Sequence, residues 1–430
     1  MRALRHIGLI VGSGLLLGGL WPGTLLAQGT APDRTILLYQ RMLQRNSRDA
    51  RAYYRLGDAY IQKARESGDV TYFDLAEQAL RKALEISPRY SDALRHLAFA
   101  LYSRHDFAGA AREAGTAIDL NPGDSHAYGI LGDAYLEVGK YAEAGQTYQK
   151  MLQLRGDLYS YSRRSGLRSL RGDAEGAIED LKRAIEDGWA SRQPRESVAW
   201  AQWQLGSDYF ALGNLPGADA QYREALKTYP NYYRALAGLA QVRAAQEQYP
   251  EAIELYQKAI ATIPLPDYAA AVGDVYKKLG RPEEAKRQYD LVEYIGYLNS
   301  LNEILYNREL AYFYADHDMK LKEALDLAKK ELGVRQDIYA YDVLAWALYK
   351  NGKPQEARAP MQEALKLGTR DARLFFHAGM IAAALGEVEG AKAHLRRALE
   401  TNPHFHLFHA DLARKTLQDL DRDGSRAAGK

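Results

Sequence analysis

Residues 199–232 carry a pattern of apolar and small positions that recurs along most of the chain. In their first half, these positions fall on one face of a helix, at Leu205, Gly206 and Tyr209. Gly213 and Asn214 then favour a break. In the second half, helical spacing returns at Ala218, Tyr222 and Ala225. Pro230 ends the segment. The pattern predicts two short helices joined by a tight turn, and one such hairpin cannot bury its apolar face alone.

The chain supplies further copies of this hairpin. A large residue followed by Gly or Ala marks most copies, and Ser165 marks the weakest one. The copies begin at residues 50, 91, 125, 158, 199, 233, 266, 304, 338 and 372. Most steps are 33 or 34 residues long, and three are lengthened to 38 or 41. A period near 34 is typical of stacked helix-turn-helix repeats.

Small residues also recur in the second helix of every copy. They are Ala76, Ala110, Ala144, Ala177, Ala218, Ala252, Ala285, Ala324, Ala357 and Ala391. We expect the two helices of a copy to cross closely at these positions, since bulky residues would force them apart. Prolines at 88, 122, 230, 264 and 403 are expected to end second helices, because Pro cannot continue the hydrogen-bond ladder.

These features resemble the tetratricopeptide repeat family, in its exported bacterial type. The matching positions are clearest at Tyr128, Leu131, Gly132, Tyr135, Ala144 and Tyr148. The resemblance covers residues 50–403. It implies an all-α, right-handed superhelical solenoid of about ten repeats with a C-terminal capping helix. The family serves many partners as a scaffold, so the fold alone does not define the function.

The repeats divide the chain into seven segments. They are a signal peptide or membrane anchor (1–27), a linker and lone starting helix (28–49), repeats 1–4 (50–189), an interruption (190–198), repeats 5–10 (199–403), a capping helix (404–420) and a disordered tail (421–430). The interruption is expected either to bend the stack or to form a longer loop within a continuous spiral. In the capping helix, Phe405, Phe408 and Leu412 are expected to share one face.

The N-terminus has the features of a secretory signal. Arg2 and Arg5 precede an apolar core at 7–20, and Ala27 ends a cleavage site. The alternative is an uncleaved anchor, because residues 7–26 are just long enough to span a bilayer. The expected location is therefore the periplasm or the exterior, or the inner membrane with the repeats facing the periplasm. The chain contains no Cys, which excludes disulfides and thiolate metal sites.

The net charge and the absence of catalytic motifs argue against two classes of function, nucleic-acid binding and enzyme activity. The formal net charge is +2, and removal of residues 1–27 with their two Arg residues leaves about zero. We therefore expect no nucleic-acid partner. The mature sequence lacks a phosphate-binding Gly-Lys-Ser/Thr loop, a His-Glu-x-x-His motif and a Gly-x-Ser-x-Gly motif. We expect a non-enzymatic protein without a cofactor.

The family resemblance implies a site on the concave face, where the first helix of each repeat presents a fixed set of positions. In this sequence they carry Trp200, Trp203, Phe210, Arg308, Tyr312, Tyr339, Asp342, Trp346, Tyr349, Lys350 and Phe376. Aromatic residues with interleaved charge are common in binding hot spots. We expect a protein or peptide segment to bind there, although each aromatic side chain could instead pack between repeats.

Two alternative functions remain open. One is a membrane-tethered accessory factor for envelope assembly or secretion. The other is a metal-binding or metal-dependent protein that uses His404, His406 and His409, since imidazoles suit transition metals. A second polar cluster, Asp316 to Asp318, falls in a turn of the repeat register and is expected to be solvated.

Overall fold

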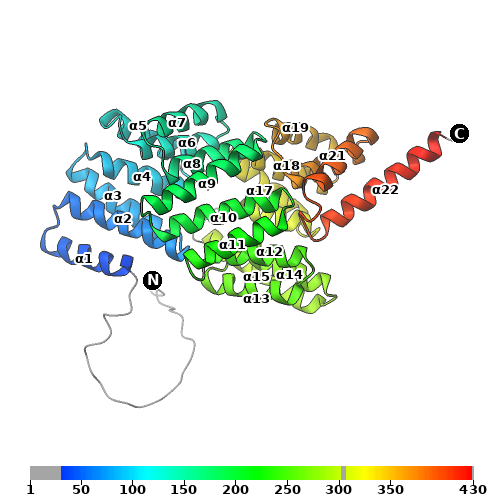
Figure 1. Ribbon diagram of the computed structural model, residues 1–430, viewed down its shortest axis with the longest axis horizontal. Helices are drawn as coiled ribbons and strands as arrows, with labels where there is room; N and C mark the ends of the chain where they lie inside the picture. Colours follow the sequence, from blue (N-terminus) through cyan, green and yellow to red (C-terminus); the bar gives the residue numbers. More distant parts are fainter. Residues whose placement is uncertain (1–30, 302–306, 429–430) are drawn as a thin grey trace, which may run out of the picture.

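The computed structural model describes residues 31–301 and 307–428, which form 22 α-helices and no β-strand (Figure 1). Ten helical pairs follow one another in chain order, which confirms the predicted all-α superhelical repeat fold. The first helices are α2 (Ala50–Ser67), α4 (Ser91–Ser103), α6 (Ser125–Glu137), α8 (Leu158–Leu170), α10 (Arg195–Ala211), α12 (Tyr233–Ala245), α14 (Pro266–Lys278), α16 (Asn307–Asp316), α18 (Ile338–Lys350) and α20 (Ala372–Ala384). The second helices are α3 (Thr71–Ile86), α5 (Phe107–Leu120), α7 (Tyr141–Leu154), α9 (Ala174–Ala190), α11 (Leu215–Thr228), α13 (Tyr249–Thr262), α15 (Pro282–Leu301), α17 (Leu321–Val334), α19 (Pro354–Leu365) and α21 (Val388–Thr401). Helices α1 (Ala31–Arg45) and α22 (His409–Ala428) flank the pairs.

Each pair is held by a close crossing of its two helices. In the fifth pair, a methyl group added at Gly206 of α10 would lie 2.7 Å from the ring of Tyr222 on α11. In the first pair, Gly57 meets Leu80 in the same way. The recurring alanines of the second helices are buried, nine of them at 0% exposure and Ala285 at 3%. Small side chains therefore let large neighbours fill the crossing, as the sequence pattern predicts.

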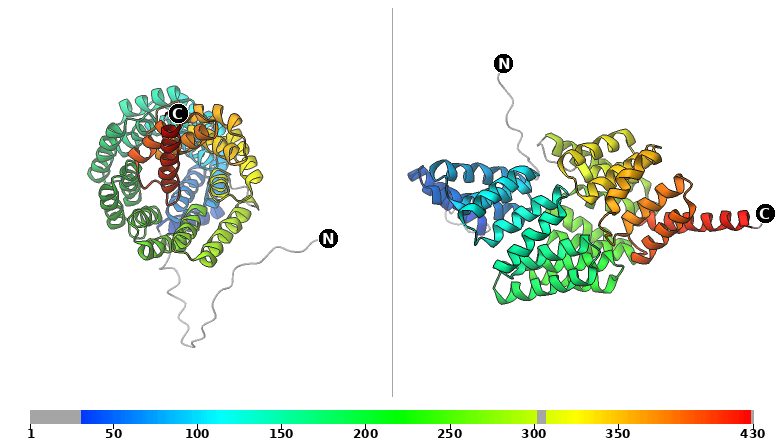
Figure 2. Two further views of the ribbon diagram at one scale, coloured as in Figure 1. Left: turned by 90° about the vertical axis from the view of Figure 1, so that its right-hand side faces the viewer. Right: turned by 90° about the horizontal axis from the view of Figure 1, so that it is seen from above.

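The first helices lie on the inner side of the superhelix. Most of them contact the first helix of the next pair, as α2 does with α4 and α16 with α18. Within the described residues, no two second helices make comparable contact, because they are spread around the outer side. Viewed from the end of the molecule that carries the C-terminus, the pairs form a ring around the superhelix axis (Figure 2).

Successive turns of the superhelix also contact each other. The turn after the first helix of one pair meets the loop that precedes the pair six places further along the chain. The hydrogen bonds that join such segments include Arg335 to Glu137, Thr369 to the carbonyl oxygen of Leu170, and, before α22, Asn402 to the carbonyl oxygen of Phe210. These partners are 198, 199 and 192 residues apart. The superhelix is therefore compact along its axis, with successive turns in contact.

The expected interruption at 190–198 is short in the structure. Helix α9 runs to Ala190 and α10 begins at Arg195, four residues before the expected position 199. Helix α10 packs against both α9 and α8, as neighbouring helices do elsewhere in the stack. Residues 191–194 thus form a loop within a continuous spiral, and no bend in the stack is needed.

The C-terminal segment differs from its prediction at both ends. Residues 402–408 form turns, so the capping helix starts at His409 rather than at 404. The side chains of Asn402 and His406 accept backbone N–H groups in this segment, which fixes a non-helical entry. Phe405 and Phe408 therefore do not share a helix face with Leu412. Helix α22 extends to Ala428, beyond the expected end of the capping helix at 420, and Asp421 pairs with Lys392 and Arg396 on α21.

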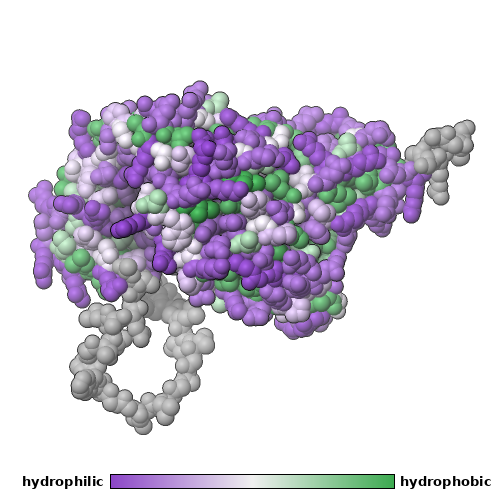
Figure 3. Space-filling model, viewed as in Figure 1, coloured by the Kyte–Doolittle hydropathy of each residue, from purple (hydrophilic) through white to green (hydrophobic). Residues whose placement is uncertain are grey.

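The predicted signal or anchor at residues 1–27 lies outside the described residues. Within the described ranges, no helix combines the length and the apolar character that crossing a membrane requires. Hydrophilic residues cover most of the face shown in Figure 3, with small hydrophobic areas scattered between them.

Candidate functional site

One partly exposed part of the predicted concave site is an aromatic group on α10. Trp200 and Trp203 are half-buried, with their ring centroids 6.3 Å apart. The guanidinium of Arg234 on α12 lies 5.0 Å from the centroid of the Trp203 ring. Because α10 and α12 meet on the inner side of the superhelix, this group faces the inner side too. We refer to Trp200, Trp203 and Arg234 as the tryptophan patch.

Other predicted residues are partly exposed but already have partners. Arg308 on α16 pairs with Asp337 at 2.9 Å and with Glu331 at 3.1 Å. Lys350 pairs with Asp318 at 2.6 Å and lies over the Trp346 ring. A binding partner would therefore compete with internal ion pairs at both cations.

Tyr339 and Tyr349 are the remaining half-buried members of the predicted set. The ring of Tyr349 stacks on Trp346, with centroids 5.0 Å apart, and the backbone carbonyl of Tyr339 accepts a hydrogen bond from the Tyr312 hydroxyl. Burial raises the pKa values of both tyrosines, and nearby carboxylates add to the effect. Both phenols are therefore neutral at physiological pH.

Five predicted site residues are buried and form the wall beneath the inner surface. They are Phe210, Tyr312, Asp342, Trp346 and Phe376, and none is more than 7% exposed. The expectation that they present their side chains to a partner is not met. The hairpins pack so closely that positions on the inner side of one helix are covered by the helix of the next pair.

The buried residues are joined by a network of hydrogen bonds. The Tyr312 hydroxyl donates to Asp342 at 2.6 Å, and the same carboxylate binds Nδ1 of His377 at 2.9 Å. Trp346 donates its Nε1–H to Asp316 at 2.7 Å. Burial would raise the pKa of Asp342, but His377, the nearby Arg373 and the Tyr312 hydroxyl outweigh it, so the pKa of Asp342 is lowered.

The three histidines predicted as a metal site do not form one cluster in the structure. His404 is exposed, whereas His406 and His409 stack with ring centroids 4.0 Å apart. Residues 402–408 form turns rather than the expected helix, and His404 is exposed in this segment. The structure instead brings His409 next to His377 of α20 and Asp316 of α16.

The polar cluster at Asp316 to Asp318 is only partly solvated. Asp318 is 68% exposed at its side chain, but the side chains of Asp316 and His317 are 13% and 7% exposed. Nε2 of His317 lies 2.7 Å from an oxygen of Asp274. Burial alone would lower the pKa of His317, but Asp274 outweighs it, so the pKa is raised.

Sequence reasoning did not identify several inner charges. Asp267 begins α14, Glu309 lies in the first turn of α16, and Arg373 begins α20. Partial burial and the neighbouring Asp267 raise the pKa of Glu309 to about 7. Asp267, Arg373 and Trp200 are each the second residue of their repeats. This shared position could have identified Asp267 and Arg373 as inner residues from the sequence.

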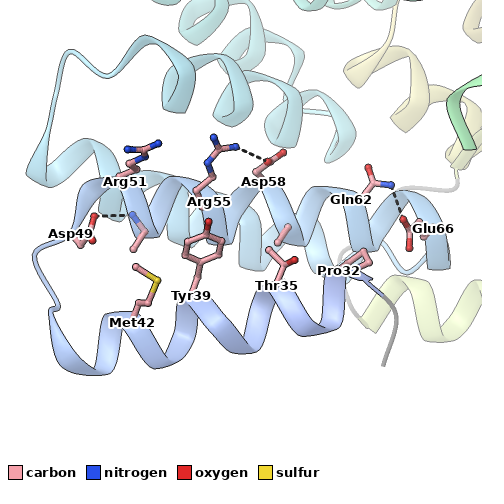
Figure 4. A pocket seen from close by; sticks show the side chains of 12 residues that line it. Pro32, Thr35, Tyr39, Met42, Asp49, Arg51, Arg55, Asp58, Gln62 and Glu66 are labelled. Carbon is pink, nitrogen blue, oxygen red and sulfur yellow. Dashed lines mark hydrogen bonds and ion pairs between the residues drawn. The ribbon is translucent and has the colours of Figure 1, made fainter. Parts of the chain in front are cut away.

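A second concave region lies at the N-terminal end of the stack. Helices α1 and α2 enclose an open groove of about 670 Å³. Thr35, Tyr39 and Met42 point from α1 toward α2, and Arg55 pairs with Asp58 across the upper side of α2 (Figure 4). Met42 is 40% exposed. The groove therefore offers both apolar and charged contacts.

The fold defines a solenoid of helical hairpins, and the first helices of the hairpins line its inner surface. Sequence models of the tetratricopeptide repeat match residues 50–90, 96–159, 204–270 and 343–404. The chain belongs to the tetratricopeptide repeat family. A search of curated proteins finds no match.

Solved structures of other proteins align with this chain. Human IFIT1, solved as a dimer with m7Gppp-AAAA, aligns over 78% of this chain and 76% of its own, with 16% identity and a TM-score of 0.52. PilW, described as a widely conserved type IV pilus biogenesis factor, aligns over 46% of this chain and 90% of its own, with 16% identity and a TM-score of 0.41. A thermophilic repeat protein of the same family from Thermus thermophilus aligns over 46% of this chain and 100% of its own, with 21% identity and a TM-score of 0.40. At 16% identity and a TM-score of 0.52, the likeness to IFIT1 concerns the fold alone.

Proposed function

We propose that the protein is a non-enzymatic scaffold that holds a segment of a partner protein against its inner helices. The observation that carries this proposal is the tryptophan patch, since two half-buried indoles and a guanidinium remain accessible on α10 and α12. Large aromatic side chains and Arg dominate the energy of protein interfaces. A stack whose helices are already in place loses little entropy when the partner binds.

The inner charges favour a polypeptide as the partner. Arg234 and Arg373 are positive, whereas Asp267 and Glu309 supply carboxyl groups on neighbouring repeats. A wall with both signs suits a peptide that carries both signs, whereas a nucleic acid with its continuous negative backbone is bound by a continuous positive surface. We therefore propose a protein partner and no nucleic acid.

The N-terminal sequence supports a role in the bacterial envelope. Two Arg residues followed by an apolar core favour export to the periplasm or the exterior. If the segment is retained, the protein is an accessory factor tethered to the inner membrane. The mass of the mature protein decides between these cases, because cleavage after Ala27 leaves Gln28 as the first residue.

The test is crosslinked capture of partners from the native cells. Trp200→Ala combined with Trp203→Ala should abolish capture while the helical circular dichroism is retained. Trp189→Ala is the matched control, because Trp189 is 48% exposed and belongs to the outer helix α9. Equal capture by the double variant and the wild type would reject the tryptophan patch as the site.

A further inference from the structure

Three potential metal ligands from distant parts of the chain converge at the C-terminal end of the stack. Asp316 ends α16, His377 lies in α20, and His409 begins α22. One ligand atom of each residue lies within 4.8 Å of the other two. Neither repeat packing nor the helix termini require a carboxylate and two imidazoles at one point.

Two of these side chains are held in place by further hydrogen bonds. The Asp342 carboxylate accepts a hydrogen bond from Nδ1–H of His377, at 2.9 Å and 3.0 Å to its two oxygens. This bond leaves the lone pair on Nε2 of His377. Trp346 donates its Nε1–H to Oδ1 of Asp316. A carboxylate on the far nitrogen of a histidine is the usual arrangement behind a metal ligand.

The imidazoles also have nitrogen atoms without a partner. Among the residues that the structure describes, neither Nε2 of His377 nor Nδ1 of His409 has a hydrogen-bond partner, although both atoms are buried. The two residues are 0% and 5% exposed. Leaving a buried polar atom unsatisfied costs about 1–3 kcal/mol. The free lone pair on Nε2 of His377 lies in the cluster with Asp316 and His409, and Nε2 of His409 is 3.8 Å from the Asp316 carboxylate. A cation bound between these three residues would satisfy the buried His377 nitrogen.

We propose that Asp316, His377 and His409 bind a divalent transition-metal ion, with Zn²⁺ as the best fit. Two imidazoles and one carboxylate are a zinc donor set, and ligands at about 2.1 Å from the ion lie roughly 3.4 Å from each other. The present separations need only small side-chain rotations to reach this value. The Asp316 side chain is 13% exposed, so a water molecule can complete the coordination.

Charged side chains of both signs surround the proposed site. Arg373 and Lys350 oppose a cation, but Asp342 and Asp274 contribute two negative charges to the same region.

The ion would join three elements that are far apart in sequence. Asp316 belongs to the eighth pair, His377 to the tenth, and His409 to the C-terminal helix. Binding would therefore fix α22 on the end of the stack and stabilise the folded chain, because the unfolded chain has no such site.

The experiment is titration of the purified, chelator-treated full chain with Zn²⁺, with heat of binding and thermal unfolding as readouts. We expect one ion per chain and a higher Tm with Zn²⁺. Asp316→Asn should weaken binding at least tenfold and remove the Tm shift. This variant keeps the size of the side chain and an oxygen for Trp346, so it should fold; helical circular dichroism checks this.

Two further measurements make the result decisive. Titration with Co²⁺ should give a visible spectrum in the wild type that His377→Gln and Asp316→Asn lose. His404→Gln is the control, because His404 is a nearby exposed histidine outside the site, and it should bind as the wild type does. The proposal fails if the wild type binds less than one ion, if Asp316→Asn binds equally well, or if His404→Gln abolishes binding. Failure would leave a water molecule as the occupant and would not affect the capture experiment.

Discussion

Nε of Arg335 donates a hydrogen bond to the Glu137 carboxylate at 2.7 Å, and this ion pair joins two turns of the superhelix that are 198 residues apart in sequence. Arg335 also binds Nε2 of His105 at 2.8 Å and lies over the ring of Phe107. The Tyr102 hydroxyl donates to the other oxygen of Glu137 at 3.0 Å. One guanidinium therefore connects the end of α17 to three elements of the preceding turn.

Arg335→Ala should loosen this contact between turns. It leaves a carboxylate that is largely buried without its cation, since the Glu137 side chain is 20% exposed. We expect the free energy of unfolding to fall by about 2 kcal/mol, the range for a hydrogen bond to a charged group. Chemical denaturation measures this loss, and small-angle scattering should show a larger radius of gyration.

The control for this variant is Lys258→Ala. Lys258 pairs with Glu254 on the outer surface, where both side chains are more than half exposed. Exposed pairs contribute at most about 1 kcal/mol. If Arg335→Ala costs no more than Lys258→Ala and the radius is unchanged, the contact does not hold the turns together.

Gly139→Ala tests the backbone contact between the same two turns of the superhelix. Gly139 has φ +73°, and an added methyl group would lie 2.5 Å from the carbonyl oxygen of Gln336 in the next turn. Gly352 has the same φ, but nothing lies within 4 Å of its added methyl group. Both variants carry the strain of a positive φ, about 1–2 kcal/mol. Only Gly139→Ala adds the clash, about 1–3 kcal/mol more.

Thermal unfolding of the two glycine variants gives the comparison directly. The Tm of Gly139→Ala should lie several degrees below that of Gly352→Ala. Equal Tm values would mean that the two turns separate easily at this point and that the superhelix is open in solution.

The fold could be predicted because each repeat interacts mainly with its neighbours. The crossing of Gly206 and Tyr222 depends on residues within one hairpin, and its spacing recurs along the chain. The contacts between turns leave no such pattern. Whether Glu137 meets Arg335 depends on the pitch of the superhelix, which sums small rotations over six pairs and cannot be read from spacing.

The exposure of the candidate site residues was harder to predict from the sequence than the fold. Trp203 and Trp346 occupy inner positions of their first helices, but Trp203 is half-buried and Trp346 is 1% exposed. The difference comes from the next repeats, where His377 and Phe376 cover Trp346. The convergence of His409 with Asp316 also depends on how the C-terminal turn is folded, which the assumed continuous helix concealed.

Trp346→Ala should destabilise the fold rather than remove a contact with the partner. The indole stacks on His377 with ring centroids 4.1 Å apart and donates a hydrogen bond to Asp316. Loss of a buried Trp side chain costs about 3–5 kcal/mol. Tyr349→Ala should cost less, because Tyr349 is half-buried. Denaturant titration of both variants checks the order, and equal losses would contradict the burial of Trp346.

His105 should make the protein sensitive to acid. Burial, followed by the charges of Arg335 and Arg308, lowers the pKa of His105 to about 3. In the unfolded chain its pKa is about 6.5. Below pH 6.5 the unfolded state therefore binds more protons than the folded state, and stability falls as the pH falls toward 3.

The expected loss from His105 is about 1 kcal/mol per pH unit between pH 6 and pH 4, somewhat less than the limit for one proton because the ring is partly exposed. His105→Asn removes the titrating group and tolerates the positive φ of 64° at this position. His409 also has a lowered pKa, so part of the acid sensitivity should remain in the variant. Denaturant titrations at pH 7, 6, 5 and 4 should show a shallower decline for His105→Asn than for the wild type. Parallel declines would mean that His105 is protonated in the folded protein and that its contact with Arg335 does not persist in solution.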